Sequence, residues 1–156
     1  MGIKLEQKDD PYWRSRNNEP IKASDFAILA GNANPALSKA VASRLGTKLA
    51  PGTVKKFADG EIRCEFDASD ISGKHCYIMQ PTCRPVNDSL MELITMISAC
   101  RRAGALSVTV VAPYYGYARQ DRGTPGKAVP ITSGDVAQII EFMGANRIIS
   151  VDLHSL

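Results

Sequence analysis

Short apolar runs alternate with amphipathic stretches along the chain from residue 26 onward. Apolar runs bounded by glycine, proline or polar residues predict buried strands at 26–31, 75–81, 106–115 and 147–154. Apolar positions at helical spacing predict helices at 34–46, 87–105 and 131–145. Between the first helix and the second of these strands, residues 54–66 predict a hairpin that turns at Asp59-Gly60.

The predicted helices carry recognisable end signals. We expect Asn34 to cap the first helix, with Pro35 in its first turn and Gly46 just past its end. We expect Thr132 to open the third helix, with Asp135 completing a variant of the capping box. The second helix is the most clearly amphipathic, and its predicted apolar face consists of Leu90, Leu93, Ile94, Ile97 and Cys100.

This order of elements predicts an α/β domain with a mostly parallel sheet, helices on both faces and one hairpin. Open sheets of this kind bind ligands beyond the carboxyl ends of their strands. Two polar segments fall at such ends, "YYGYARQDR" at 114–122 and "DLHS" at 152–155, and a third, "FADGE" at 57–61, forms the hairpin tip. These three segments are the candidate ligand-binding regions.

Composition narrows the class of protein. With 156 residues, 44% of them hydrophobic and 22% charged, the chain fits one globular domain. A formal net charge of +3 is too small to indicate nucleic-acid binding, but it is compatible with an anionic small-molecule substrate. No apolar run approaches the roughly 18 residues that span a bilayer. The four scattered cysteines predict reduced, mostly buried thiols in a cytoplasmic protein.

Residues 1–25 differ from the rest of the chain. They hold five acidic and five basic side chains and the only tryptophan, Trp13. We expect this segment to be an extension outside the main core, docked through Tyr12 and Trp13, followed by a domain that covers 26–156.

The segment at 114–125 combines aromatic rings with planar cations. The guanidinium of Arg119 can stack on a base and pair with phosphate oxygens. Gln120 and Asp121 can bond ribose hydroxyls or order the loop. The alternative is a solvated turn whose Tyr115 and Tyr117 cover the edge of the core. These residues alone leave both interpretations open.

The hairpin tip also allows two interpretations. The ring of Phe57 can stack on adenine, and the carboxylate of Glu61 can accept a hydrogen bond from its exocyclic amine. The alternative is that Asp59 and Gly60 only form the turn and that Phe57 belongs to the core.

Asp152 and His154 alternate along the last predicted strand, so we expect them to point to the same side. Together they can hold Mg²⁺, directly or through water, or bind phosphate. Two ligands are too few for a metal site on their own, and a histidine hydrogen-bonded at a strand end is the alternative. Neither the three-glycine Rossmann fingerprint nor a "GxxxxGK[ST]" sequence occurs, so ATP binding would depend on a different structural motif.

In order and spacing, "FADGE", "NDSLMELITMISACRRAGA", "APYYGYARQDR" and "RIISVDLHSL" together resemble the ribose-phosphate pyrophosphokinases, or phosphoribosyl pyrophosphate synthetases. The resemblance covers about residues 26–156, and its "YARQD" and "DLHS" blocks are highly diagnostic. It implies a three-layer phosphoribosyltransferase-like fold. It also implies transfer of the diphosphoryl group of Mg-ATP to the C1 hydroxyl of ribose 5-phosphate, giving phosphoribosyl pyrophosphate and AMP. Assembly as a homo-oligomer, with dimers that build hexamers, is implied as well.

The resemblance also implies roles for the candidate residues. By the resemblance, the hairpin tip contacts adenine across a subunit boundary, through Phe57, Asp59, Gly60 and Glu61. The other subunit holds the nucleotide through Arg119, Gln120 and Asp121. Asp152 and His154 lie at the phosphates and Mg²⁺, and the implied catalytic residues are Arg119 and His154.

Family members continue past "DLHSL" into a second domain with an Asp-Asp pair and a Thr/Gly-rich loop for ribose 5-phosphate. Because these motifs do not occur in this sequence, we expect the chain to be the ATP-binding half of the enzyme and to be inactive alone. A non-catalytic, synthetase-associated regulatory subunit is the alternative, although the intact "YARQD" favours the catalytic branch. The near-neutral charge disfavours a nucleic-acid surface built from Tyr114, Tyr115, Tyr117, Arg119 and Arg122.

Overall fold

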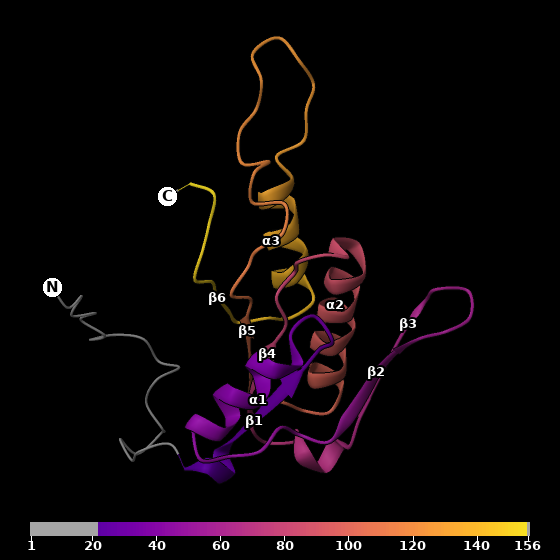
Figure 1. The fold of residues 1–156 in the computed structure, drawn as a ribbon, viewed down its shortest axis with the longest axis vertical. Coiled ribbons are helices and arrows are strands. Elements are labelled where there is room, and N and C mark those ends of the chain that lie inside the picture. The colour runs from indigo at the N-terminus through magenta and orange to yellow at the C-terminus, as the bar shows by residue number, and fades with distance from the viewer. Residues whose placement is uncertain (1–21, 156) are drawn as a thin grey trace, which may run out of the picture.

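A four-stranded parallel sheet forms the centre of the structure, a computed structural model that describes residues 22–155 (Figure 1). Neighbouring strands all pair in parallel. In spatial order the strands are β1 (Phe26–Ala30), β4 (His75–Met79), β5 (Ser107–Val111) and β6 (Arg147–Ile149). The predicted mostly parallel sheet is therefore confirmed. The expected docking through Tyr12 and Trp13 lies outside the described residues; a short 3-10 helix, η1 (Ala23–Asp25), leads into β1.

The main core lies between the sheet and two helices, α2 (Val86–Arg102) and α3 (Thr132–Phe142). Ile78 of β4, Leu93 of α2 and Ile140 of α3 are all fully buried in this cluster. Successive side chains of a strand point to opposite faces, so the same strands present other residues to the second face. No helix within 22–155 is long and apolar enough to cross a membrane.

The second face of the sheet carries α1 (Pro35–Arg44). Ala42 of this helix packs with Ile28 and Met79 in a separate, smaller cluster. Helices thus cover both faces, as the sequence predicts. Asn34 caps α1 as expected, because its side-chain oxygen accepts a hydrogen bond from the Leu37 N–H at 3.0 Å.

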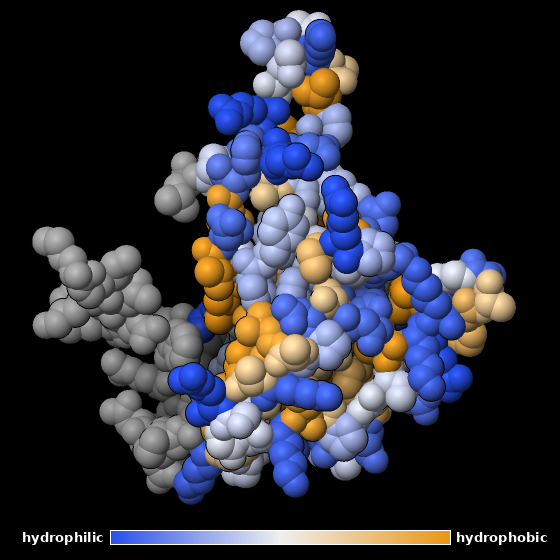
Figure 2. Space-filling view, viewed as in Figure 1, coloured by the Kyte–Doolittle hydropathy of each residue, from blue (hydrophilic) through white to orange (hydrophobic). Residues whose placement is uncertain are grey.

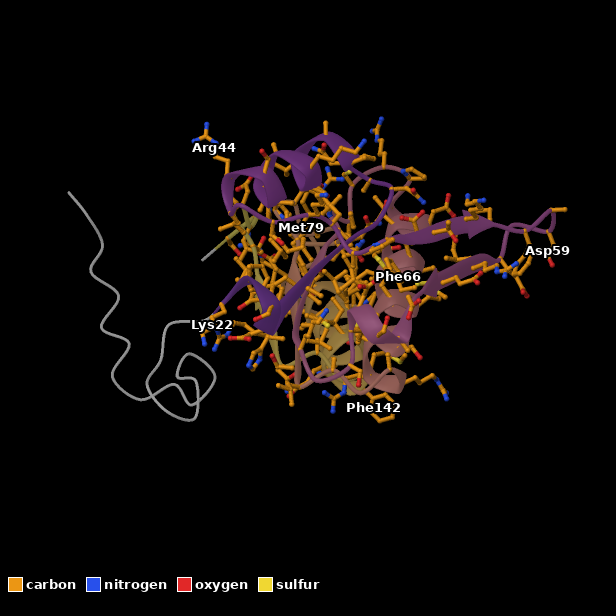
Figure 3. All side chains as sticks on the ribbon, turned by 90° about the horizontal axis from the view of Figure 1, so that it is seen from below. Lys22, Arg44, Asp59, Phe66, Met79 and Phe142 are labelled. Carbon is orange, nitrogen blue, oxygen red and sulfur yellow. The ribbon has the colours of Figure 1, made fainter. Side chains whose placement is uncertain are left out.

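A two-stranded antiparallel hairpin stands apart from the central sheet. It consists of β2 (Gly52–Lys56) and β3 (Ile62–Phe66), and Asp59 lies at its tip. Figure 3 shows Asp59 at the outer end of this arm and Phe66 at its base, against the body of the molecule. Ile62, Cys64 and Phe66 alternate along β3 and pack against the main core. A second 3-10 helix, η2 (Ala68–Asp70), follows the hairpin.

The thiols agree with the sequence-based expectation in part. All four cysteines are free; Cys76 and Cys100 are buried, whereas Cys64 and Cys83 are half-buried. Burial raises the pKa of Cys64 to about 11, so this thiol stays protonated near neutral pH.

Two local expectations are wrong. α3 does begin at Thr132, but its N-cap is Ile131 and no side chain caps it. Thr132 instead donates its hydroxyl to the Gln120 side-chain oxygen at 2.7 Å, because the preceding loop brings that acceptor to the start of the helix.

The last strand ends at Ile149 and does not continue to 154. Its partner β5 ends at Val111, and the last regular bond between the two strands runs from the Ala112 N–H to the Ile149 carbonyl at 2.9 Å. The Pro113 carbonyl still accepts a 3.3 Å bond from the Asp152 N–H, and Asp152 forms only an isolated bridge with Tyr114. Asp152 and His154 are therefore not neighbours on one side of a strand.

Candidate functional site

The segment after β5 folds into a tight turn at 114–120 that is held first by the end of β4. The Gly116 N–H donates to the Thr82 hydroxyl at 2.6 Å, and the Thr82 N–H donates to the Tyr114 carbonyl at 3.0 Å. A Cβ added at Gly116 would lie 2.6 Å from the Thr82 carbonyl oxygen, so only glycine fits this contact. Tyr117 has a φ of 63°, which a non-glycine residue adopts only when its surroundings impose it.

Two helix starts hold the same turn. The Tyr117 hydroxyl donates to the Asn87 side chain in the first turn of α2. At the start of α3, the Tyr115 hydroxyl donates to the Ser133 carbonyl at 2.9 Å. The Ser133 N–H and hydroxyl donate to the Gln120 carbonyl at 3.1 and 3.0 Å. The turn at 114–120 is thereby fixed to three elements, β4, α2 and α3.

Tyr115 and Gln120 therefore have structural roles. Tyr115 is buried, and burial raises the pKa of its hydroxyl. For this residue the interpretation that it covers the edge of the core is correct. Gln120 uses its side-chain oxygen on Thr132 and its backbone carbonyl on Ser133, so it links the turn to α3 whether or not it also contacts a ligand.

Arg119 is different, because it is exposed and has no hydrogen-bond or ion-pair partner among residues 22–155. It lies beside a cavity of about 420 Å³ that is lined by Val86, Tyr114, Tyr117, Ala118, Arg119 and Gln120. The structure thus places an unpaired guanidinium and two tyrosine rings around one cavity at the carboxyl end of β5, where α/β sheets bind ligands.

A second cavity, of about 550 Å³, lies between the turn, the start of α3 and the segment after β6. Its polar lining includes Asp121, Ser133, Ser150, His154 and Ser155. The Asp121 carboxylate accepts a hydrogen bond from the Ser155 hydroxyl. That bond, aided by Arg122 and His154, lowers the pKa of Asp121. The structure therefore brings Asp121 near His154, a pairing that the sequence did not indicate.

Asp152 lies elsewhere. It lines an apolar groove of about 870 Å³ between α1 and the sheet, together with residues such as Ile28, Leu37 and Met79. The few polar groups in this groove make it a poor site for a polyphosphate. Figure 2 shows further apolar surface along the edge of the molecule where β6 and the segment after it lie. Within 22–155 no group of three or more His, Cys, Asp or Glu side chains could hold a metal.

The hairpin tip forms a third, separate group. Phe57 is 50% exposed, so the interpretation that it belongs to the core is wrong. Asp59 accepts a 3.1 Å bond from the Glu61 N–H, and Gly60 has a φ of 95°, so both residues do form the turn. Figure 1 shows the arm projecting away from the body of the molecule. The tip does not line the cavities beside Arg119 and His154.

Several residues that hold the site were not found from the sequence, namely Thr82, Asn87 and Ser133. Their signal was weak but present: short polar side chains directly after a predicted strand or at a predicted helix start. Such residues commonly bond nearby backbone, so their position alone does not reveal partners that lie 13 to 34 residues away.

The fold and the site define a class of domain that is suited to anionic small ligands. It is a parallel α/β domain with the turn at 114–120, here called the clamped turn, at its strand ends. An unpaired arginine lies on this turn, and a histidine lies beside a carboxylate next to it. The model of the N-terminal domain of ribose phosphate pyrophosphokinase matches residues 26–144. The chain belongs to the ribose-phosphate pyrophosphokinase family.

Individual relatives and a solved structure are similar to this chain over most of its length. A ribose-phosphate pyrophosphokinase of Marinomonas sp. is 49% identical over 132 residues, covering 85% of this chain and 42% of the relative. The enzyme named ribose-phosphate pyrophosphokinase in Synechococcus elongatus is 52% identical over 128 residues, covering 82% of this chain and 38% of the relative. The crystal structure of phosphoribosylpyrophosphate synthetase from Mycobacterium smegmatis has a TM-score of 0.80 at 39% identity, covering 84% of this chain and 43% of that one. The chain thus spans about two fifths of the length of the relatives it matches.

The clamped turn predicts an unequal effect of two glycine substitutions. Gly116→Ala should lower the free energy of unfolding by about 2 kcal/mol, because the added methyl group meets the Thr82 backbone. Gly123→Ala, where a Cβ meets nothing within 4 Å, should change it by less than about 0.5 kcal/mol. Urea unfolding of both variants measures the difference. Equal, small changes would show that the turn is not held as described.

The Asp121–Ser155 hydrogen bond predicts a pH effect. Because the folded-state pKa of Asp121 lies below its ordinary 3.8, its stabilising contribution is present above that value and is lost as the pH falls through the folded pKa. Ser155→Ala should move the pKa of Asp121 up toward 3.8 in an NMR titration of the carboxyl carbon. The pKa of Asp67, lowered by Ser69, should stay unchanged and serves as the control. An unchanged pKa of Asp121 in the Ser155→Ala variant would contradict the hydrogen bond.

Proposed function

We propose that this chain forms the ATP-binding part of a ribose-phosphate diphosphokinase. The reaction transfers the diphosphoryl group of Mg-ATP to the C1 hydroxyl of ribose 5-phosphate and yields phosphoribosyl pyrophosphate and AMP. Membership of the family supports this proposal, as do relatives that are named for this activity. Since the chain matches about two fifths of each relative, the reaction is proposed for a protein that includes this domain.

The observation that carries the proposal is the unpaired Arg119 on the clamped turn. A guanidinium without a protein partner is free to form paired hydrogen bonds with phosphate oxygens. Because three elements fix the turn, the cation is held in place before the ligand arrives, which reduces the entropic cost of binding. Gln120 and Asp121, already anchored to Thr132 and Ser155, are proposed to contact the ribose side of the nucleotide.

His154 is the proposed residue at the phosphates and Mg²⁺, with Asp121 beside it in the same cavity. Asp152 lines the apolar groove and not this cavity, so its proposed contact with Mg²⁺ is through water rather than direct. The donor set fits Mg²⁺ that arrives on the polyphosphate, since this ion keeps several waters and needs only one or two protein carboxylates when phosphates supply the rest. It does not fit a metal held by the protein alone, since no group of three candidate ligands occurs within 22–155. When bound, Mg²⁺ would neutralise phosphate charge.

The chemical step needs no protein nucleophile. The C1 hydroxyl oxygen bonds to the β-phosphorus of ATP, and the bond from that phosphorus to the oxygen bridging to the α-phosphorus breaks. AMP leaves with the bridging oxygen, and the hydroxyl proton passes to solvent. Catalysis of such a transfer depends on positioning and on neutralising phosphate charge, which are the proposed contributions of Arg119 and His154.

The adenine contacts are proposed to come from another copy of the chain. Phe57, Asp59, Gly60 and Glu61 lie at the end of a projecting arm and away from the cavity beside Arg119. A site that combines both groups therefore requires a homo-oligomer, for which a dimer-based hexamer is the proposed arrangement.

Calorimetric titration of Mg-ATP into the chain at high protein concentration tests the proposal. Arg119→Ala should weaken binding by about tenfold to a hundredfold, because a charge-assisted hydrogen bond contributes about 1.5–3 kcal/mol. Arg102→Ala, an exposed arginine at the end of α2, is the matched control and should bind as the unchanged chain does. Equal binding by both variants would contradict the proposed role of Arg119. Nucleotide binding without any activity in an assembled, full-length protein would favour a regulatory subunit instead.

A further inference from the structure

A carboxylate with no cationic partner among residues 22–155 is buried on the core side of α2. Glu92 is 7% exposed and accepts three hydrogen bonds. The donors are the Asn32 N–H at 2.9 Å, the Asn32 side-chain amide at 2.8 Å and the Gln80 side-chain amide at 2.8 Å. A buried charge is tolerated only when it is well bonded, so these three donors define the position of the Glu92 side chain closely.

The network continues from Glu92 to the hairpin. The Asn32 side-chain amide also donates to the Val54 carbonyl in β2, at 2.8 Å. Asn32 follows β1 on a separate segment of the chain, and both its backbone and its side chain are held by Glu92. The hairpin is thereby linked through one residue to a buried carboxylate on α2.

Other contacts also hold the hairpin. The Ala50 N–H donates to the Ile28 carbonyl at 2.8 Å and fixes the chain two residues before β2. Ile62 and Phe66 pack against the core, but apolar packing is non-directional and limits distance more than angle. The Lys56–Asp88 ion pair also joins the hairpin to α2, but its side chains are 48% and 35% exposed, and exposed pairs contribute little. An isolated two-stranded hairpin is marginally stable by itself, so its orientation depends on such anchors.

We infer that Glu92 is a positioning residue that sets the direction of the hairpin arm, and that it acts through Asn32 on Val54. Its relevance to nucleotide binding rests on the proposed function, since the tip carries the proposed adenine contacts. The mechanical part of the inference, that the arm loses its fixed direction without this link, stands independently of that function.

Backbone ¹⁵N relaxation of the chain tests the mechanical part. Asn32→Ala removes the link to Val54 but keeps the bond between Gln80 and Glu92, and it changes an exposed residue. Amides at 57–61 should become more mobile relative to those of β4 and β5. Ser107→Ala is the control, because it removes the 2.7 Å bond to His75 on the central sheet without touching the hairpin. A hairpin as rigid in Asn32→Ala as in the unchanged chain would overturn the inference.

The role of Glu92 itself is tested by a double-mutant cycle. Glu92→Gln should also loosen the arm, but it should add little once Asn32 is alanine, because both act through one link. Additive effects on the mobility at 57–61 would show that Glu92 acts by another route and would overturn its assignment. If Glu92→Gln does not fold, Asn32→Ser with partial recovery of the order at 57–61 supports the link, and no recovery contradicts it.

A nucleotide titration separates this inference from the proposed function. At concentrations where the chain self-associates, Asn32→Ala should weaken Mg-ATP binding by about as much as Phe57→Ala, and the double variant should be no weaker. If Phe57→Ala binds normally, the proposed adenine contact fails, while the relaxation data still decide whether Asn32 and Glu92 position the arm.

Discussion

The candidate site depends on the close contact between Gly116 and Thr82. These residues follow β5 and β4, which lie side by side in the parallel sheet, so both segments leave the sheet at the same edge. The 2.6 Å bond from the Gly116 N–H to the Thr82 hydroxyl closes the turn there. Because Gly116 has no side chain, the turn can approach Thr82 this closely and present Arg119 at the strand end.

The same turn connects the site to both helices of the main core. Asn87 at the start of α2 holds Tyr117, and Ser133 at the start of α3 holds Tyr115 and Gln120. Anchoring on rigid elements fixes a functional side chain more accurately than a free loop does. It also explains why residues that suit a ligand by their chemistry, such as Gln120, have bonds to the protein itself.

The regular elements could be predicted because their causes are local. Apolar runs and periodicity identified β1, β4, β5 and the three helices, and Asn34 and Asp59-Gly60 marked a cap and a turn that the structure confirms. The errors have tertiary causes. Thr132 bonds Gln120 rather than capping its helix, and the pairing of β5 with β6 ends at Ile149 instead of continuing to His154. The burial of Glu92 was not predicted, because a carboxylate within an amphipathic helix gives no sign of the distant amide groups that donate hydrogen bonds to it.

The central claim is that a nucleotide polyphosphate binds beside Arg119 and His154, and not in the larger apolar groove beside α1. Mapping Mg-ATP onto the chain by amide chemical shifts tests this claim most directly. The account predicts saturable shifts at 117–121 and at 153–155, with little change for Leu37, Val41 and Met79 in the groove. Saturable shifts centred on the groove, with 117–121 unaffected, would contradict it.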